Sequence, residues 1–255
     1  MKMNITFLGT GTSQGVPLIA CLCEVCRSHD TLDKRLRTSV MVEVKNKVIV
    51  IDSGPDFRQQ MLRENVMRLD ALIFTHAHKD HIAGMDDIRA FNYISNQRIE
   101  VYADEIVEKA IRREFPYIFD ELKYPGVPEI NLNLISNDHF IAAETPITPI
   151  QVLHYKLPVK GFRIGDFTYI TDANFIAESE KQKIKGSKVL VLNALRKESH
   201  ISHFNLFEAI ALAEELGAEQ TYFTHISHQL GRHQEVDKLL PSGMNLAYDG
   251  LKIEI

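Results

Sequence analysis

The sequence predicts an α/β (α+β) protein in which two mixed β-sheets pack against each other and helices cover their outer faces. Each half of the chain begins with segments typical of β-hairpins and continues with alternating strand and helix patterns. An apolar strand ending in Thr-His occurs once in each half, at residues 73–78 and 222–228. The 255 residues, 45% of them hydrophobic and 25% charged, suffice for one self-supporting domain, which we assign to residues 1–255.

The first half is expected to contain a hairpin, further strands and two helices. Apolar patterns predict strands at residues 5–8, 40–44, 48–51, 71–74 and 101–103. The turn Lys45-Asn46-Lys47 joins the second and third of these strands, and Asp52-Ser53-Gly54-Pro55 ends the third. Helices are expected at residues 57–64 and, with Asp104 as the N-terminal cap, at residues 104–114.

The second half repeats this order. Strands are predicted at residues 148–153, 161–164, 167–170, 189–192, 221–223 and 251–255. A helix over residues 205–216 is expected to end at Gly217, because glycine is common just past a helix end.

Charge and hydropathy exclude several classes of partner. The net charge of −5 argues against a large nucleic-acid partner, whose phosphates require a basic surface. The apolar run within residues 1–8 is too short for a signal peptide, and no stretch reaches the roughly 20 apolar residues of a membrane span. A cytoplasmic location without a membrane partner is therefore expected. The oligomeric state stays open, a homodimer included.

The strongest chemical signal is His76-Ala77-His78-Lys79-Asp80-His81, directly after a predicted strand. Three imidazoles and a carboxylate in six residues form a donor set suited to zinc, manganese or iron. A lone histidine in a surface loop would need no special explanation. Four potential ligands packed directly behind a strand do need one, and a metal site provides it.

The pattern His-x-His-x-Asp-His resembles the signature motif of the metallo-β-lactamase superfamily. That family's later ligands have counterparts here in His154, Asp172 and His225, each at or just after a predicted strand end. The resemblance spans nearly the whole chain. It implies a four-layer αβ/βα sandwich with two divalent metal ions, zinc or manganese, in the active site. It also implies one ion held by His76, His78 and His154, a second held by Asp80, His81 and His225, and Asp172 as the bridging ligand.

A second candidate metal site is the segment Cys21-x-Cys23-x-x-Cys26. An odd number of closely spaced cysteines is poor material for disulfides, whereas three thiolates in six residues match a structural zinc. We expect His228 to supply the fourth ligand, since it follows the Thr-His strand end of the second half. The alternative is a group of three buried thiols without metal.

Three segments together narrow the resemblance: Gly9-Thr10-Gly11-x-x-Gln14-Gly15-Val16-Pro17, the cysteine segment, and Thr224-His225-Ile226-Ser227-His228-Gln229. They resemble the phosphoribosyl 1,2-cyclic phosphate phosphodiesterases, which are similar in their core to transfer-RNA 3′-processing endonucleases. The resemblance implies that the substrate is a small molecule, a cyclic phosphodiester carried on a sugar or nucleotide.

The same resemblance implies catalytic roles. His203 would contact the substrate phosphate and protonate the leaving oxygen, with His200 as the competing candidate for this role. The expected nucleophile is a hydroxide shared by the two metal ions. Asp80 is expected to be essential for activity because it is one of the ligands.

Other functions are compatible with parts of the pattern. A nuclease of the transfer-RNA-processing type would need a basic, flexible arm, and the sequence contains no Gly-Pro-Lys-rich insertion. A thioester or lactone hydrolase would use the same histidine motif. A di-iron oxidoreductase of this superfamily would be expected to carry glutamate where His78 stands. A non-catalytic metal-binding scaffold is a further alternative. Such a protein would be expected to have lost some ligands, whereas here every ligand position is filled.

Overall fold

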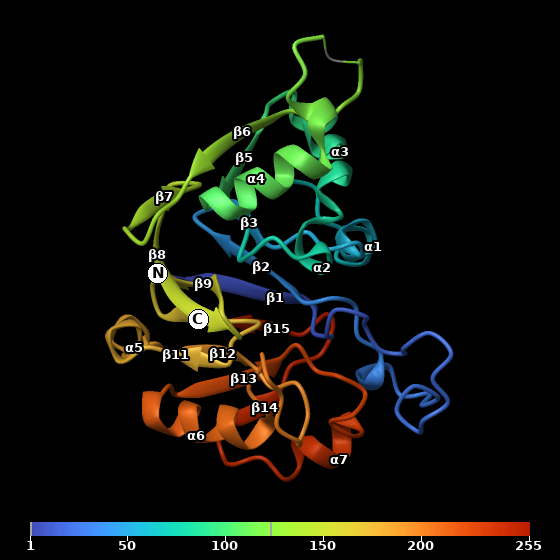
Figure 1. Ribbon diagram of the computed structural model, residues 1–255, viewed down its shortest axis with the longest axis vertical. Coiled ribbons are helices and arrows are strands. Elements are labelled where there is room, and N and C mark those ends of the chain that lie inside the picture. The colour runs from blue at the N-terminus through green and yellow to red at the C-terminus, as the bar shows by residue number, and fades with distance from the viewer. Residues whose placement is uncertain (1, 123) are drawn as a thin grey trace.

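The computed structural model describes residues 2–122 and 124–255 and contains two β-sheets packed between helices (Figure 1). The first sheet has seven strands in the order β15-β1-β2-β3-β4-β5-β6. The second has the order β11-β8-β9-β10-β12-β13-β14, with β7 paired to β8. The predicted class, two mixed sheets with helices outside, is confirmed.

In each sheet, antiparallel strands at one end give way to parallel strands at the other. The first sheet consists of β1 (Met3–Gly9), β2 (Ser39–Val44), β3 (Lys47–Ile51), β4 (Ala71–Ile73), β5 (Ile99–Ala103), β6 (Ile130–Leu134) and β15 (Lys252–Glu254). The second consists of β7 (Phe140–Ala142), β8 (Thr145–His154), β9 (Leu157–Ile164), β10 (Phe167–Tyr169), β11 (Phe175–Ile176), β12 (Val189–Asn193), β13 (Gln220–Thr224) and β14 (Met244–Leu246).

Three apolar clusters separate four layers. The central cluster joins the inner faces of the two sheets and includes Phe7, Ile51, Phe162 and Tyr169, all fully buried. A second cluster lies between the first sheet and its helices: α1 (Phe57–Arg63), α3 (Arg89–Ser95) and α4 (Glu105–Glu114). A third lies between the second sheet and α5 (Glu178–Ile184), α6 (Leu206–Leu216) and α7 (His233–Asp237). This burial in layers is the main source of fold stability.

Helix ends follow the expected local chemistry. The side chain of Asp104 accepts a hydrogen bond from the Val107 amide and begins α4. Asn205 and Glu208 form a capping box at the start of α6, and Gly217 ends this helix in the left-handed conformation.

Several elements were not predicted from the sequence: β6, β7, β11, β14, α3, α5, α7 and the one-turn helix α2 (Lys79–Ile82). Most are short, and β6, β11 and β14 pair with strands that other elements separate from them in the sequence, so local patterns carry little signal for them. Strand β9 also begins at Leu157, earlier than expected, because it forms a long hairpin with β8. Within the part of the chain that the structure describes, no helix is long and apolar enough to cross a membrane.

The parallel strands determine where the functional residues lie. Strands β3 and β4 run parallel in the first sheet, and β10, β12 and β13 run parallel in the second. In α/β folds, the loops after such strands form the ligand-binding edge. The loops after β4, β10 and β13 carry the candidate ligands of the histidine centre except His154, which ends β8.

Candidate metal centre

The chain turns sharply after β4, and this turn determines where its polar side chains lie. His76 is almost fully buried, and its Nδ1 lies 2.9 Å from Thr75 Oγ1. His78 is the last extended residue before α2, and this single turn carries Asp80 and His81. The turn packs closely on the loop after β3, where a Cβ atom at Gly54 would lie 2.0 Å from the backbone oxygen of Asp80. Glycine is therefore required at position 54 for this approach.

Asp172, in the turn after β10, lies at the middle of the site. Its Oδ1 is 3.3 Å from His81 Nε2, and its Oδ2 is 3.2 Å from His225 Nε2 and 3.3 Å from His203 Nε2. Its Oδ2 also lies 3.9 Å from His76 Nε2. Burial raises the pKa of the Asp172 carboxyl, but the rings of His225 and His81 outweigh it and hold the pKa well below its usual range.

Two groups of ligand atoms share Asp172. In one group the ligand atoms of Asp80, His81, Asp172 and His225 all lie within 4.8 Å of one another, and in the other those of His154, Asp172 and His203 do. The structure thus brings together the residues expected to bind the second ion. It also brings His203 within reach of the centre.

The three histidines expected at the first ion lie side by side. His76 Nε2 is 3.0 Å from His78 Nδ1, and the ring centroids of His78 and His154 are 5.1 Å apart. His154, at the end of β8, donates from Nδ1 to the backbone oxygen of Ser202 at 2.9 Å. Its Nε2 is therefore left with a free lone pair.

The donor set fits divalent metal ions. Among the described residues, His81 Nε2 and both ring nitrogens of His225 are buried and have no hydrogen-bond partner. Buried polar atoms are seldom left unpaired, and here the Nε2 atoms of His81 and His225 face carboxylate oxygens across gaps of 3.2–3.3 Å. Imidazole nitrogens and carboxylate oxygens arranged in this way suit zinc or manganese.

Asp52, directly after β3, belongs to this site, whereas its local sequence predicts only a turn. Its carboxylate accepts hydrogen bonds from His81 Nδ1 at 2.7 Å and from the Thr75 amide and hydroxyl, each at 2.8 Å. Burial opposes a charge on His81, but the carboxylates of Asp52 and Asp172 raise its pKa well above the usual value. A carboxylate that fixes Nδ1 directs Nε2 of a ligating histidine towards the metal.

His203 and His200 occupy different positions. His203 is almost fully buried, with its ring centroid 4.5 Å from that of His154 and 4.7 Å from that of His225. His200 lies behind it, more exposed, with the two Nδ1 atoms 3.2 Å apart. Burial lowers the pKa of His203 to about 4. Of the two, His203 is the one in contact with Asp172.

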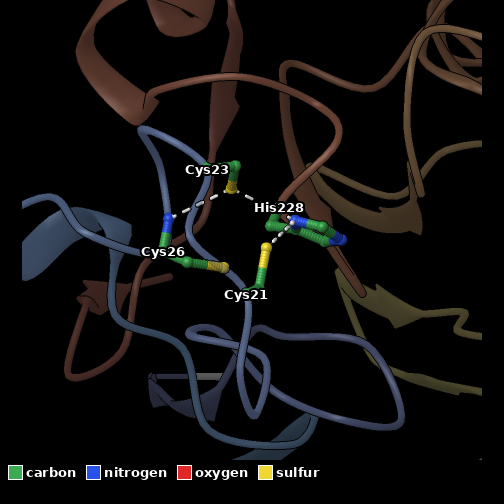
Figure 2. A group of neighbouring side chains, drawn as sticks. All are labelled: Cys21, Cys23, Cys26 and His228. Carbon is green, nitrogen blue, oxygen red and sulfur yellow. Dashed lines mark hydrogen bonds between the residues drawn. The ribbon is translucent and has the colours of Figure 1, made fainter.

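The second candidate site is formed by Cys21, Cys23, Cys26 and His228 (Figure 2). Their four ligand atoms lie within 4.8 Å of one another, and His228 Nδ1 is 3.4 Å from Cys21 Sγ and 3.3 Å from Cys23 Sγ. Burial raises the pKa of Cys23, but the Cys26 amide and the His228 ring lower it to about 6. Thiolates and an imidazole at such spacing are a zinc donor set, and they join the N-terminal loop to the segment after β13.

The two packed mixed sheets and the histidine cluster at their edge are the features of the metallo-β-lactamase fold. Residues 47–226 match the family model described as a beta-lactamase superfamily domain, and the chain belongs to that family. The resemblance inferred from the histidine motif is therefore confirmed.

Three individual proteins to which the chain is similar have names that state an activity. The chain is similar to a solved structure of a new diphosphatase from the PhnP family, with 40% identity, a TM-score of 0.94, and coverage of 100% of this chain and 98% of that one. It is 38% identical over 253 residues to an octanoyltransferase from Porphyromonas gingivalis, covering 98% of this chain and 51% of that protein. It is 28% identical over 176 residues to ribonuclease Z from Prochlorococcus marinus (strain MIT 9301), covering 64% of this chain and 50% of that protein. The chain thus spans about half the length of these two curated relatives.

Proposed function

We propose that this protein is a dinuclear metal-dependent phosphodiesterase that hydrolyses a small, cyclic phosphodiester carried on a ribose or nucleotide. The observation that carries the proposal is the position of Asp172, whose two oxygens contact imidazoles delivered by both sheets. A single carboxylate between two groups of imidazoles is the donor arrangement of a two-metal site.

The first ion would be held by His76, His78 and His154, and the second by Asp80, His81 and His225, with Asp172 shared between them. Bound divalent ions supply Lewis acidity towards a phosphoryl group and make water acidic near neutral pH. Zinc and manganese both suit this set of ligands, because it mixes imidazole nitrogens with carboxylate oxygens. We further propose a zinc ion at the cysteine site with a structural role.

His203 is the proposed proton donor to the leaving oxygen. Its Nε2 faces Asp172, so a phosphate held at the centre would lie beside this ring. Burial keeps the ring neutral when no substrate is present, and a phosphate anion beside it would raise its pKa. His203 would therefore take up its proton together with the substrate and release it to the departing alkoxide.

A second candidate substrate carries a diphosphate instead of a cyclic monophosphate. This candidate is favoured by the 40% identity to a diphosphatase of the PhnP family. The same residues would act on either substrate, because both reactions transfer a phosphoryl group to water.

Acyl transfer and cleavage of large RNA are less well supported. The name octanoyltransferase belongs to a relative about twice as long, so its activity can reside in the half that this chain does not match. All three cysteines of the chain belong to the candidate zinc site with His228, so no thiol stands beside Asp172 to accept an acyl group. The net charge of −5 disfavours a large RNA, in spite of the similarity to ribonuclease Z.

A substrate panel tests the proposal. The purified protein, loaded with zinc or manganese, would be assayed with bis-p-nitrophenyl phosphate, cyclic ribose and nucleotide phosphates, a diphosphate diester, an octanoyl thioester and a lactone. We expect the highest kcat/KM for a cyclic phosphate and loss of turnover after chelation. Preference for the diphosphate would select the second candidate, and preference for the thioester or lactone would contradict both.

A further inference from the structure

Asn174 links three segments that surround the metal centre. It lies two residues after Asp172, and its backbone amide donates to the Leu153 oxygen at 2.8 Å. Its side-chain Oδ1 accepts from the Tyr155 amide at 2.7 Å, and its Nδ2 donates to the Ile201 oxygen at 3.1 Å. One amide group therefore binds the end of β8 on one side and the loop before α6 on the other.

Each of these backbone groups is next to a residue of the centre. Tyr155 follows His154 and has a φ of 56°, a left-handed conformation that a non-glycine residue rarely adopts unless it is held there. Ile201 precedes Ser202, whose backbone oxygen accepts the Nδ1 hydrogen of His154 at 2.9 Å. Displacement of either segment would change the direction in which the His154 ring points.

The same loop positions His203. This residue follows Ser202, and its ring centroid lies 4.5 Å from that of His154. The next residue, Phe204, donates its amide to the Ala173 oxygen at 2.7 Å, which ties the loop to the Asp172 turn a second time. The spacing between the His154 and His203 rings therefore depends on the contacts of residues 173 and 174.

The chemistry of this link requires an amide side chain. An ordinary Asx turn bonds the side chain to backbone two residues away, whereas the partners of Asn174 lie 19 and 27 positions away. Aspartate would keep the bond from Tyr155 but place a carboxylate against the carbonyl of Ile201. Alanine would lose both bonds.

We propose that Asn174 is a positioning residue, which sets the orientation of His154 and its spacing from His203 and thereby the geometry and affinity of the metal centre. This inference rests on the proposed dinuclear centre and adds a residue that touches neither metal nor substrate. Groups that orient the ligands of a metal commonly change its affinity by about 10–100-fold when they are removed.

The chain offers a matched control in Asn92 of α3. Its Nδ2 donates to the backbone oxygens of Gln97 and Glu129, each at 2.8 Å, and its Oδ1 accepts from the Glu129 amide at 3.0 Å. It therefore links segments as Asn174 does, but on the helical face of the first sheet. Asn92→Ala removes a comparable link without touching the loops of the centre.

The test compares Asn174→Ala, Asn174→Asp and Asn92→Ala with the unchanged protein, all substituted with Co²⁺. The absorption spectrum, the affinity for Co²⁺ in competition with a chelator, and Tm would be measured. We expect both Asn174 variants to have altered spectra, and Asn174→Ala to bind one Co²⁺ ion about 10–100-fold more weakly. We expect Asn92→Ala to alter only Tm.

Asn174 variants with the spectrum and affinity of the unchanged protein, and a fall in Tm like that of Asn92→Ala, would overturn the proposal. These readouts need no substrate. An unchanged protein that binds two Co²⁺ ions at the histidine centre, in addition to any ion at the cysteine site, but hydrolyses no phosphodiester would refute the proposed function and leave the role of Asn174 to be decided by the spectra.

Discussion

Asp52 and His81 are both fully buried and are joined by a hydrogen bond of 2.7 Å between Oδ2 and Nδ1. They come from different strand ends, since Asp52 follows β3 and His81 lies in the turn after β4. The same carboxylate accepts two hydrogen bonds from Thr75, whose hydroxyl in turn lies 2.9 Å from His76 Nδ1. Asp52 therefore orients His81, a ligand of the second proposed ion, directly, and His76, a ligand of the first, through Thr75.

Asp52→Asn should weaken metal binding while the chain still folds. Asparagine can keep its oxygen for His81 and the Thr75 hydroxyl, but its amide nitrogen then faces the backbone N–H of Thr75, and the charge beside His81 is lost. Affinity for metal at the histidine centre should fall by about 10–100-fold, measured by chelator competition.

Asp70→Asn is the matched control for this change. Asp70 also accepts a hydrogen bond from a backbone amide, that of Val48 at 2.9 Å, and lies at the opposite end of the same strands. It should keep full metal affinity. Equal affinity in Asp52→Asn and Asp70→Asn would show that Asp52 does not orient the ligands.

His203→Gln should reduce kcat on an alkyl phosphodiester by about 10²–10⁴-fold, the usual contribution of a general acid. Metal content should stay unchanged, because His203 is not one of the seven proposed ligands. The loss should be much smaller for bis-p-nitrophenyl phosphate, since p-nitrophenolate departs without a proton.

His200→Gln separates the two histidines. Its ring lies behind that of His203 and outside the group of atoms around Asp172. We therefore expect a smaller effect that does not depend on the leaving group. A dependence on the leaving group in His200→Gln, and none in His203→Gln, would exchange their roles.

Cys23→Ser should lose one equivalent of zinc and lower Tm while leaving the metal of the histidine centre in place. The cysteine loop contains little regular secondary structure, so its order depends on the proposed zinc ion. Loss of about 3 kcal/mol would lower Tm by roughly 6–12 °C. Ser28→Ala, in the same loop, should change neither zinc content nor Tm measurably. Unchanged zinc stoichiometry and Tm in Cys23→Ser would exclude a structural zinc here.

Local signals predicted much of the fold and of the site. The cap of α4 at Asp104 and the glycine end of α6 depend on residues a few positions apart, and both were found as predicted. The histidine segment after β4 was recognisable because four potential ligands stand within six residues. His154, Asp172 and His225 were proposed as ligands because they match the later ligands of the family that the motif resembles, and each stands at or near the end of a predicted strand.

The parts that were missed depend on distant contacts. Asp52 acts on a histidine 29 positions away, and its place in an Asp-Ser-Gly-Pro turn gave a sufficient local explanation. Asn174 binds backbone groups 19 and 27 positions away, which no local pattern encodes. Short strands such as β11 and β14 exist because a neighbouring strand supplies their hydrogen bonds.

His233→Asn should reduce the loss of stability in mild acid. In the folded protein His233 Nδ1 lies 3.0 Å from Arg35 Nη2, and burial followed by the Arg35 charge lowers the pKa of this ring, which Asp30, Asp33 and Asp237 only partly oppose. The unfolded chain therefore binds a proton near the ordinary pKa of 6.5, and the folded chain only at lower pH. The stability that the neutral His233 ring contributes is complete above the ordinary pKa of 6.5 and declines as the pH falls below it.

Urea midpoints of the unchanged protein and of His233→Asn between about pH 7.5 and 5.5 would test this, because an asparagine oxygen can still accept from Arg35 but does not titrate. A stability difference that stays constant over this range would show that the folded protein protonates His233 as readily as the unfolded chain does.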